Sequence, residues 1–186
     1  MAINDNATLI IGAGNYFKAP VDTALPSDLK NVAAPWENIG HTSLEDIFGM
    51  SSEGGEATAI GTLQNKSLRT TYSKRTETIT FTLQQWDTDG LKLFYGSNAT
   101  VGANGELRVP TNPEPTTTAF LVVFIDGSNR FAFYAPKAEI YRGDDLSISD
   151  TESLAGLPLA VKPLASGTNQ WTYAVTPLGS TPPVNP

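Results

Sequence analysis

The chain offers few residues for catalysis, because it contains one histidine, His41, and no cysteine. A Ser-His-Asp triad would have to use His41, yet the sequence contains no Gly-x-Ser-x-Gly nucleophile motif. Without cysteine, disulfides, thiolate metal sites and cysteine nucleophiles are excluded. We therefore interpret His41 as a polar residue at the end of a strand, and we predict no catalytic residue and no enzymatic activity.

Two partial motifs resemble ligand sites but lack residues that those sites require. Gly12-Ala-Gly14 follows a strand-like segment, as in a dinucleotide-binding motif, but the third glycine is missing and Pro20 stands where the helix should run. Asp87-Thr-Asp-Gly90 begins like a calcium-binding loop, but the closing acidic ligands are absent. A glycine bulge in a strand and the cap of a helix explain these motifs better, so we predict no cofactor and no metal.

Three tryptophans, Trp36, Trp86 and Trp171, could form a stacking surface for a sugar. A β-sandwich binding module, carbohydrate-binding or of another kind, is therefore an alternative function. Each tryptophan lies beside or within a segment of apolar alternation, which favours packing in the core.

The distribution of charge singles out one basic loop in an acidic chain. The net charge is −7 and the pI is about 4.6, which argues against a DNA-binding protein with the usual basic face. Residues 64–75 nevertheless hold four of the twelve basic residues and no acidic one: Lys66, Arg69, Lys74 and Arg75. The loop is either a solvated hairpin tip or a docking loop that is steered onto an acidic surface of an identical neighbour.

A candidate for that acidic partner surface lies late in the chain. It consists of Asp144, Asp145, Asp150 and Glu152. The same residues could bind a divalent cation, but a solvated acidic loop is the favoured alternative to a metal site.

The clearest element around these loops is a strand over residues 76–84. Ile79, Phe81 and Leu83 alternate with polar residues, so one face is apolar and the other is polar. The polar face consists of Thr78, Thr80, Thr82 and Gln84. We predict residues 56–63 as the antiparallel partner of this strand.

The remaining segments predict a mainly β fold with one flanking helix. Asp87 starts the helix, which ends before Gly96, and Ser43 could cap one helical turn over residues 44–50. Further strands are predicted at 8–17, 36–40, 119–125, 130–142, 157–164 and 170–176, and an extended arm at 18–35. The total of about eight strands indicates a β-sandwich or barrel over residues 1–176 with a long hairpin loop, followed by a proline-rich tail at 177–186.

No segment of the sequence has the features of a membrane anchor or a leader. Residues 1–6 lack the basic and apolar regions of a signal peptide, and the longest apolar run, 119–125, is too short to span a bilayer. We expect a protein that is made in a cytoplasm and is not embedded in a membrane.

Seven short motifs in a fixed order resemble one known family. They are Trp36–Ser43, Gly54–Thr58, Gly61–Asn65 with Leu68–Thr70, Thr78–Phe81, Asp89–Gly96, Phe124–Gly127 and Phe131–Lys137. Together they resemble the major tail protein, or tail tube protein, of long non-contractile-tailed phages (siphoviruses) of actinobacterial hosts. The resemblance covers residues 8–176 and includes no catalytic motif.

This resemblance implies a structural role in the virion. Six copies would form a ring in which one sheet from each joins an inner barrel, and stacked rings would form the tube that carries genomic DNA into the host. In the family, a long hairpin between early strands reaches the adjacent ring, and residues 64–75 occupy that place. The resemblance also implies assembly in the host cytoplasm, with a tape measure protein and tail terminator and distal tail proteins as partners.

A tube lumen must let a polyanion slide without binding it. Lysine and arginine on the lumen wall would retain phosphates, whereas hydroxyl, amide and acidic groups would not. The face of Thr78, Thr80, Thr82 and Gln84 suits such a wall, and it suits an ordinary solvent-exposed face equally well.

Overall fold

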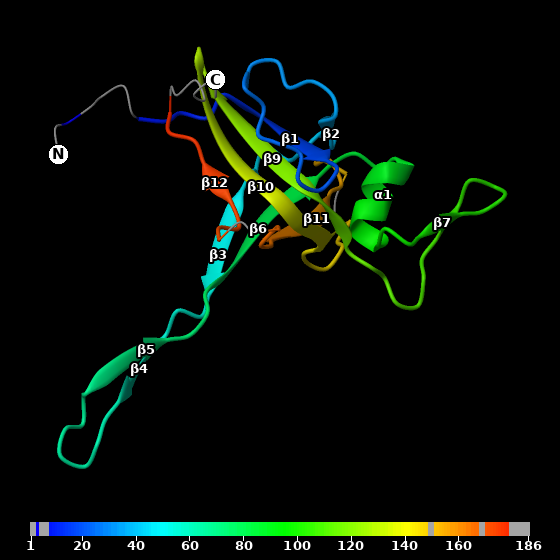
Figure 1. Cartoon of the computed structure of the whole chain (residues 1–186). Coiled ribbons are helices and arrows are strands. Elements are labelled where there is room, and N and C mark those ends of the chain that lie inside the picture. The colour runs from blue at the N-terminus through cyan, green and yellow to red at the C-terminus, as the bar shows by residue number, and fades with distance from the viewer. Residues whose placement is uncertain (1–2, 4–7, 149–150, 168–169, 179–186) are drawn as a thin grey trace.

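An eight-stranded antiparallel sheet forms the body of the protein in the computed structural model, which describes residues 3, 8–148, 151–167 and 170–178 (Figure 1). The strands follow the order β2–β1–β9–β10–β11–β6–β3, and β12 also pairs with β10. They are β1 (Ala13–Ala19), β2 (Glu37–Asn38), β3 (Gly49–Glu53), β6 (Thr76–Leu83), β9 (Thr116–Asp126), β10 (Asn129–Arg142), β11 (Leu157–Pro163) and β12 (Ala174–Val175). The predicted mainly β fold is confirmed.

Two small hairpins and one helix complete the described part of the chain. The hairpins are β4 (Ala57–Ile60) with β5 (Arg69–Tyr72), and β7 (Thr100–Val101) with β8 (Leu107–Arg108); the helix is α1 (Thr88–Tyr95). Asp87 caps α1 as predicted, because its carboxylate accepts a hydrogen bond from the Gly90 N–H at 2.8 Å. Gly96 ends the helix with a φ of 112°, which favours glycine.

The large sheet curls until its two ends face each other. The rings of Tyr16 in β1 and Phe81 in β6 stack with centroids 4.4 Å apart, although β9, β10 and β11 lie between these strands in the sheet. Residues 37–43 close the gap on one side. The Ile39 N–H donates to the Tyr16 carbonyl at 2.8 Å, and the Ser43 N–H donates to the Thr82 carbonyl at 2.9 Å. The body is therefore a strongly curved, barrel-like sheet with one core inside it.

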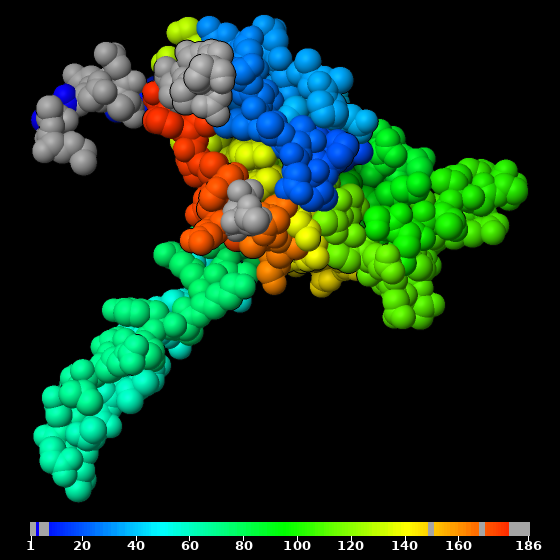
Figure 2. Space-filling model, viewed as in Figure 1, coloured from blue at the N-terminus to red at the C-terminus, as the bar shows by residue number. Residues whose placement is uncertain are grey.

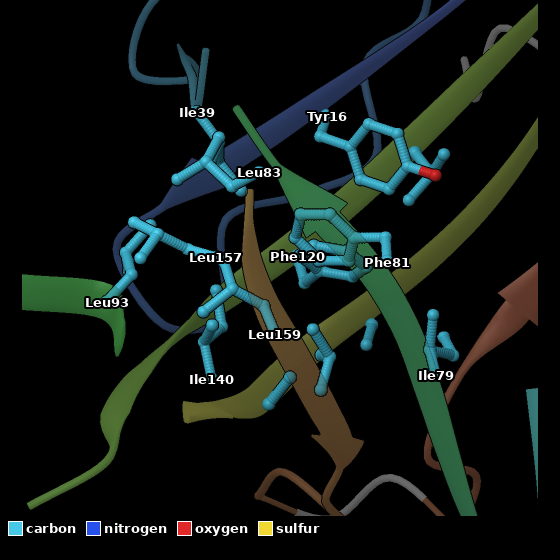
Figure 3. Close-up of a cluster of buried hydrophobic side chains, with 14 of the residues drawn as sticks. Tyr16, Ile39, Ile79, Phe81, Leu83, Leu93, Phe120, Ile140, Leu157 and Leu159 are labelled. Atoms are coloured by element: carbon cyan, nitrogen blue, oxygen red, sulfur yellow. The ribbon is translucent and has the colours of Figure 1, made fainter. Parts of the chain in front are cut away.

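Aromatic and branched side chains fill this core (Figure 3). Ile79, Phe81 and Leu83 point inward from β6, which confirms the alternation predicted for this strand. Leu93 and Phe94 of α1 contribute to the same cluster. Burial raises the pKa of the Tyr16 phenol, which donates a hydrogen bond to the Ile47 carbonyl. The helix thus belongs to the body and helps to fix β10 and β11.

A second, smaller cluster covers the outer face of β1, β9 and β10. It includes Leu121 and Tyr134 from the sheet, with Leu29 and Trp36 packed over them. The predicted arm, 18–35, starts with the last residues of β1 and continues as an irregular loop that lies in this cluster. The Tyr134 hydroxyl donates to the Thr23 carbonyl at 2.7 Å, which fixes the loop to the sheet.

Two predictions about residues 44–63 are wrong. Residues 56–63 do not pair with β6, because β4 pairs with β5, and β6 pairs with β11 on one side and β3 on the other. No helical turn forms over 44–50 either. The Ser43 hydroxyl accepts hydrogen bonds from the N–H groups of Glu45 and Asp46, but the chain then enters β3, whose Gly49 lies opposite Thr80.

The ends of other strands also differ from the predictions. The first strand begins at Ala13 instead of residue 8, and only Glu37–Asn38 of the predicted strand 36–40 is a regular strand. The continuous register from Ala13 to Ala19 opposite β9 contains no glycine bulge.

Candidate assembly surfaces

The most prominent surface feature is a hairpin that projects far from the body (Figure 2). It comprises residues 54–75, all of which are exposed. At about 3.3 Å per residue, each arm is roughly 33 Å long. Apolar side chains near its tip are among the most exposed of the chain, with Leu63 at 91% and Leu68 at 62%. A segment of this kind gains almost nothing from the core of its own subunit.

Local hydrogen bonds hold the hairpin together. The Ser73 N–H donates to the Glu56 carbonyl at 3.0 Å, and the Thr62 N–H donates to the Asn65 carbonyl at 2.7 Å at the tip. Threonine and tyrosine in β5 favour extended structure. An isolated two-stranded hairpin is only marginally stable in water, so these local bonds are its main support within the subunit.

The predicted basic residues lie at different distances from the body along the hairpin. Lys66 lies at the tip, Arg69 opens β5, and Lys74 and Arg75 lie at the base. Arg75 contacts Glu77 at 3.5 Å and also donates to the Ser52 hydroxyl. Within the described residues, Lys66, Arg69 and Lys74 form no ion pair. These three charges are thus open to a partner.

A groove on the body gathers the predicted acidic residues with two that the sequence did not reveal. Its volume is about 530 Å³, and its lining includes Asp144, Asp145 and Glu152. Glu45 and Asp46 join them from the loop before β3. No lysine or arginine is among the described residues that line this acidic groove. Asp150 lies outside the described residues.

The acidic groove also has apolar and internally paired parts. Leu44 and Leu154 line it with strongly exposed side chains. The guanidinium of Arg142 contacts the Asp145 carboxylate at 2.7 Å, which neutralises one of the five carboxylates from within the subunit. The groove therefore offers both negative charge and apolar contact to an incoming segment.

The predicted polar face of β6 lies on the outside of the curved sheet. Thr80 is exposed, and Thr78, Thr82 and Gln84 are half-buried. Gly49 and Ala160 flank Thr80 across the sheet, so this part of the face is small and uncharged. Thr82 and Gln84 also line the acidic groove, so the two predicted surfaces adjoin.

The residues with catalytic or ligand-binding potential are scattered. The exposed His41 donates its backbone N–H to the Gln85 side chain at 3.4 Å and has no described side-chain partner that would make it a base. Among the described residues, no group of three or more histidine, cysteine, aspartate or glutamate side chains could hold a metal ion. Within that same part of the chain, no helix has the length and apolar character to cross a membrane.

The prediction that all three tryptophans pack in the core is wrong for two of them. Trp36 is 7% exposed and packs edge-on against Tyr134, whereas Trp86 is 38% and Trp171 41% exposed. The indole N–H of Trp86 is bound to the Ala155 carbonyl at 2.9 Å, and Trp171 lies near Tyr134. Because the exposed tryptophans lie against different segments, they do not form a common stacking surface.

Comparisons with known proteins identify the family of this chain. The model of the phage tail tube protein family matches residues 1–177. Major tail protein Gp23 of Mycobacterium phage L5 is 34% identical over 174 residues, with 86% of this chain and 85% of that protein covered. Major tail protein Gp23 of Mycobacterium phage D29 is 33% identical with the same coverage. The predicted resemblance and structural, non-enzymatic role are confirmed: the chain belongs to the phage tail tube protein family and is a component of the virion tail.

Proposed function

We propose that six copies of this chain form a ring and that the rings stack into a tube through which duplex DNA leaves the virion without specific binding. Assembly takes place in the cytoplasm of the bacterial host. A tape measure protein inside the tube and tail terminator and distal tail proteins at its ends are the further partners. The observation that carries the proposal is the long hairpin, which is exposed over its whole length and so lacks a partner within its own subunit.

The acidic groove is the proposed acceptor for the hairpin of a copy in the adjacent ring. The basic residues Lys66, Arg69, Lys74 and Arg75 give the hairpin its positive charge, and the groove presents Glu45, Asp46, Asp144, Asp145 and Glu152. Asp150 is assigned to the same acidic surface by its position in the sequence. Opposite charges of this kind steer two surfaces together and suppress wrong pairings.

Apolar contacts contribute more of the binding energy than the charges do. Exposed ion pairs are worth about 0.2–1 kcal/mol each, because water and salt screen them. Burying a leucine side chain is worth about 1.5–3 kcal/mol. Leu63 and Leu68 on the hairpin, and Leu44 and Leu154 in the groove, are the exposed side chains that such docking would bury. The charges therefore select the partner, and the leucines hold it.

The outer face of β6 is the proposed lumen wall. Thr78, Thr80, Thr82 and Gln84 present hydroxyl and amide groups, which do not retain phosphates as lysine and arginine would. Thr82 and Gln84 of this face also line the acidic groove, whose carboxylates repel the phosphates of DNA. In a ring, pairing between the sheets of neighbouring copies also covers the exposed edge of β3.

Charge exchange tests the docking contact. Purified protein should form rings or hollow tubes in negative-stain electron microscopy. Reversing Lys66, Arg69, Lys74 and Arg75 to glutamate should stop tube growth while the subunit still folds, and Lys66→Arg with Arg69→Lys is the matched control. The charge-reversed variant should be mixed with a Glu45→Lys, Asp46→Lys variant. The negative hairpin of the first should then dock into the positive groove of the second.

Salt gives a second measure of the same contact. Exposed charges are screened over about 8 Å at physiological ionic strength, so growth of the parent should slow as salt rises. Normal tubes from the charge-reversed hairpin would refute the electrostatic part of the proposal. A protein that stays monomeric at high concentration, with tail assembly factors present, would contradict the tube itself.

A further inference from the structure

The base of the hairpin is a break between two sheets. The ladder of β3 with β6 ends at the pair Glu53–Thr76, and the hairpin's own ladder extends from Ala57–Tyr72. Between them, Gly54 and Gly55 have φ angles of 81° and 73°, which only glycine adopts without strain. Among the described residues, the hairpin leaves the body at this junction (Figure 1), so the geometry of the junction sets where the hairpin points.

One side chain crosses the break. Arg75 lies between the two ladders, and its guanidinium reaches back to both strands of the body. It donates to the Ser52 hydroxyl of β3 and contacts the Glu77 carboxylate of β6 at 3.5 Å. Glu77 in turn accepts a hydrogen bond from Tyr173, which holds the carboxylate in place and raises the pKa of that phenol.

The backbone leaves little space at the same level. A Cβ atom at Gly54 would clash with the Lys74 carbonyl, so the two arms lie in close contact where the glycines turn. The glycines on one arm have no side chain that could restrain the junction, whereas Arg75 on the other arm contacts both strands of the body. This contrast separates Arg75 from Lys66 and Arg69, which have no described ion pair.

We infer that Arg75 is a positioning residue: by linking Ser52 of β3 and Glu77 of β6 to the base of the hairpin, it fixes the direction in which the hairpin leaves the subunit. The inference rests on the proposed docking function for its biological meaning. It assigns Arg75 a task within its own subunit that the other three basic residues do not share.

The length of the hairpin makes this restraint consequential. With an arm of roughly 33 Å, a rotation of about 20° at the base moves the tip by roughly 11 Å. A displacement of that size carries Leu63 and Lys66 away from an acceptor groove. A hairpin held in one direction also loses less conformational freedom on docking, which favours assembly.

The experiment measures the direction of the hairpin in the free subunit. Because the chain contains no cysteine, Ser67→Cys at the tip and Thr117→Cys in β9 place two spin labels without background. Their distance distribution is recorded by pulsed electron spin resonance, with excess unlabelled protein so that only distances within one subunit are seen. Arg75→Ala is compared with Lys74→Ala, its exposed neighbour and matched control.

The parent and Lys74→Ala should each give one narrow distance. Arg75→Ala should lose that single distance and give a broad distribution, with an unchanged unfolding midpoint. Ser52→Ala should broaden the distance distribution less than Arg75→Ala does. Arg75→Lys should recover part of the narrow distribution, because the cation remains near Glu77. A narrow, unshifted distance in Arg75→Ala would overturn the inference, and so would equal broadening in Lys74→Ala.

The same variants separate this inference from the docking proposal. If Arg75→Ala leaves the distance unchanged while reversal of Lys66 and Arg69 stops tube growth, the positioning role is wrong and docking stands. If Arg75→Ala broadens the distance but tubes form with Lys66 and Arg69 reversed, the positioning role stands and electrostatic docking is wrong.

Discussion

Removing the hairpin should abolish tube growth without weakening the fold of the subunit. The change replaces residues 57–72 by Asn-Gly, which joins Glu56 to Ser73 through a two-residue turn. These two residues already pair, since the Ser73 N–H donates to the Glu56 carbonyl at 3.0 Å. Asn-Gly favours the turn type that fits such a tight hairpin.

The structure sets the expected size of the effect on stability. Every residue of the deleted segment is exposed, so its removal takes no side chain out of the core. Surface changes of this kind usually alter the free energy of unfolding by no more than about 0.5 kcal/mol. Phe81→Ala provides the contrast. Phe81 is 2% exposed and stacks on Tyr16 at 4.4 Å, and its truncation should cost about 3–5 kcal/mol.

Urea unfolding of the free subunit, followed by tryptophan fluorescence, measures both variants. The total stability of a domain is about 5–15 kcal/mol, so the loss in Phe81→Ala should move the midpoint far to lower urea. The hairpin deletion should keep the parent's midpoint. Negative-stain microscopy of the same samples should show tubes for the parent and none for the deletion.

Two results would refute this reasoning. If the deletion lowers the free energy of unfolding as much as Phe81→Ala does, the hairpin belongs to the cooperative core despite its exposure. If the deletion still forms normal tubes, the hairpin is not the segment that joins the rings.

Further predictions concern the helix cap, the tryptophans and the hairpin base. Asp87→Ala should lower the free energy of unfolding by about 1 kcal/mol at neutral pH. Hydrogen bonds from the first turn of the helix and from a neighbouring amide lower the pKa of Asp87 below its ordinary 3.8, so the parent should lose this contribution as the pH falls below 3.8, which urea unfolding at two pH values would detect. Acrylamide should quench Trp86 and Trp171 and leave Trp36 shielded, as single-tryptophan variants can show. Gly54→Ala should broaden the distribution of distances between spin labels on the hairpin and the body, and it should reduce tube growth. The left-handed φ and the contact with the opposite arm both exclude a Cβ at this position.

The elements that could be predicted are those with a strong local signal. In β6, Ile79, Phe81 and Leu83 alternate with polar residues because one face meets the core and the other does not. Asp87 marked the start of α1 because a carboxylate can accept the unpaired N–H groups of the first turn. Such signals depend on a few neighbouring residues and are therefore visible in the sequence.

The predictions that failed depend on contacts between distant segments. β3 reads Gly-Met-Ser-Ser-Glu, which has no apolar alternation, and it becomes a strand only because β6 offers it an edge. Ser43 makes the hydrogen bonds of a helix cap, but pairing of Gly49 with Thr80 prevents the helix. The choice of β5 instead of β6 as the partner of β4 likewise follows from the sheet as a whole.

The candidate site could be predicted only in part for the same reason. The charge of residues 64–75 is a local property, and the sequence shows it directly. The acidic groove combines Asp144 and Glu152 with Glu45 and Asp46, which lie about a hundred residues earlier. No spacing rule links these segments, because β6 and β11 bring them together through their pairing.

One subunit is proposed both to dock onto a copy in the adjacent ring and to line the lumen, and these two roles place different demands on positive charge. The sheet face that would line the lumen bears Lys162, which lies opposite Glu139 across the β10–β11 pair, beside hydroxyl groups and Ala160. The basic residues needed for docking are carried away from this face by the hairpin instead. Cations on the wall would each add affinity for phosphate and slow the passage of DNA. A projecting hairpin lets the subunit use positive charge to recognise its neighbour, while Lys162 on the proposed wall lies opposite the carboxylate of Glu139.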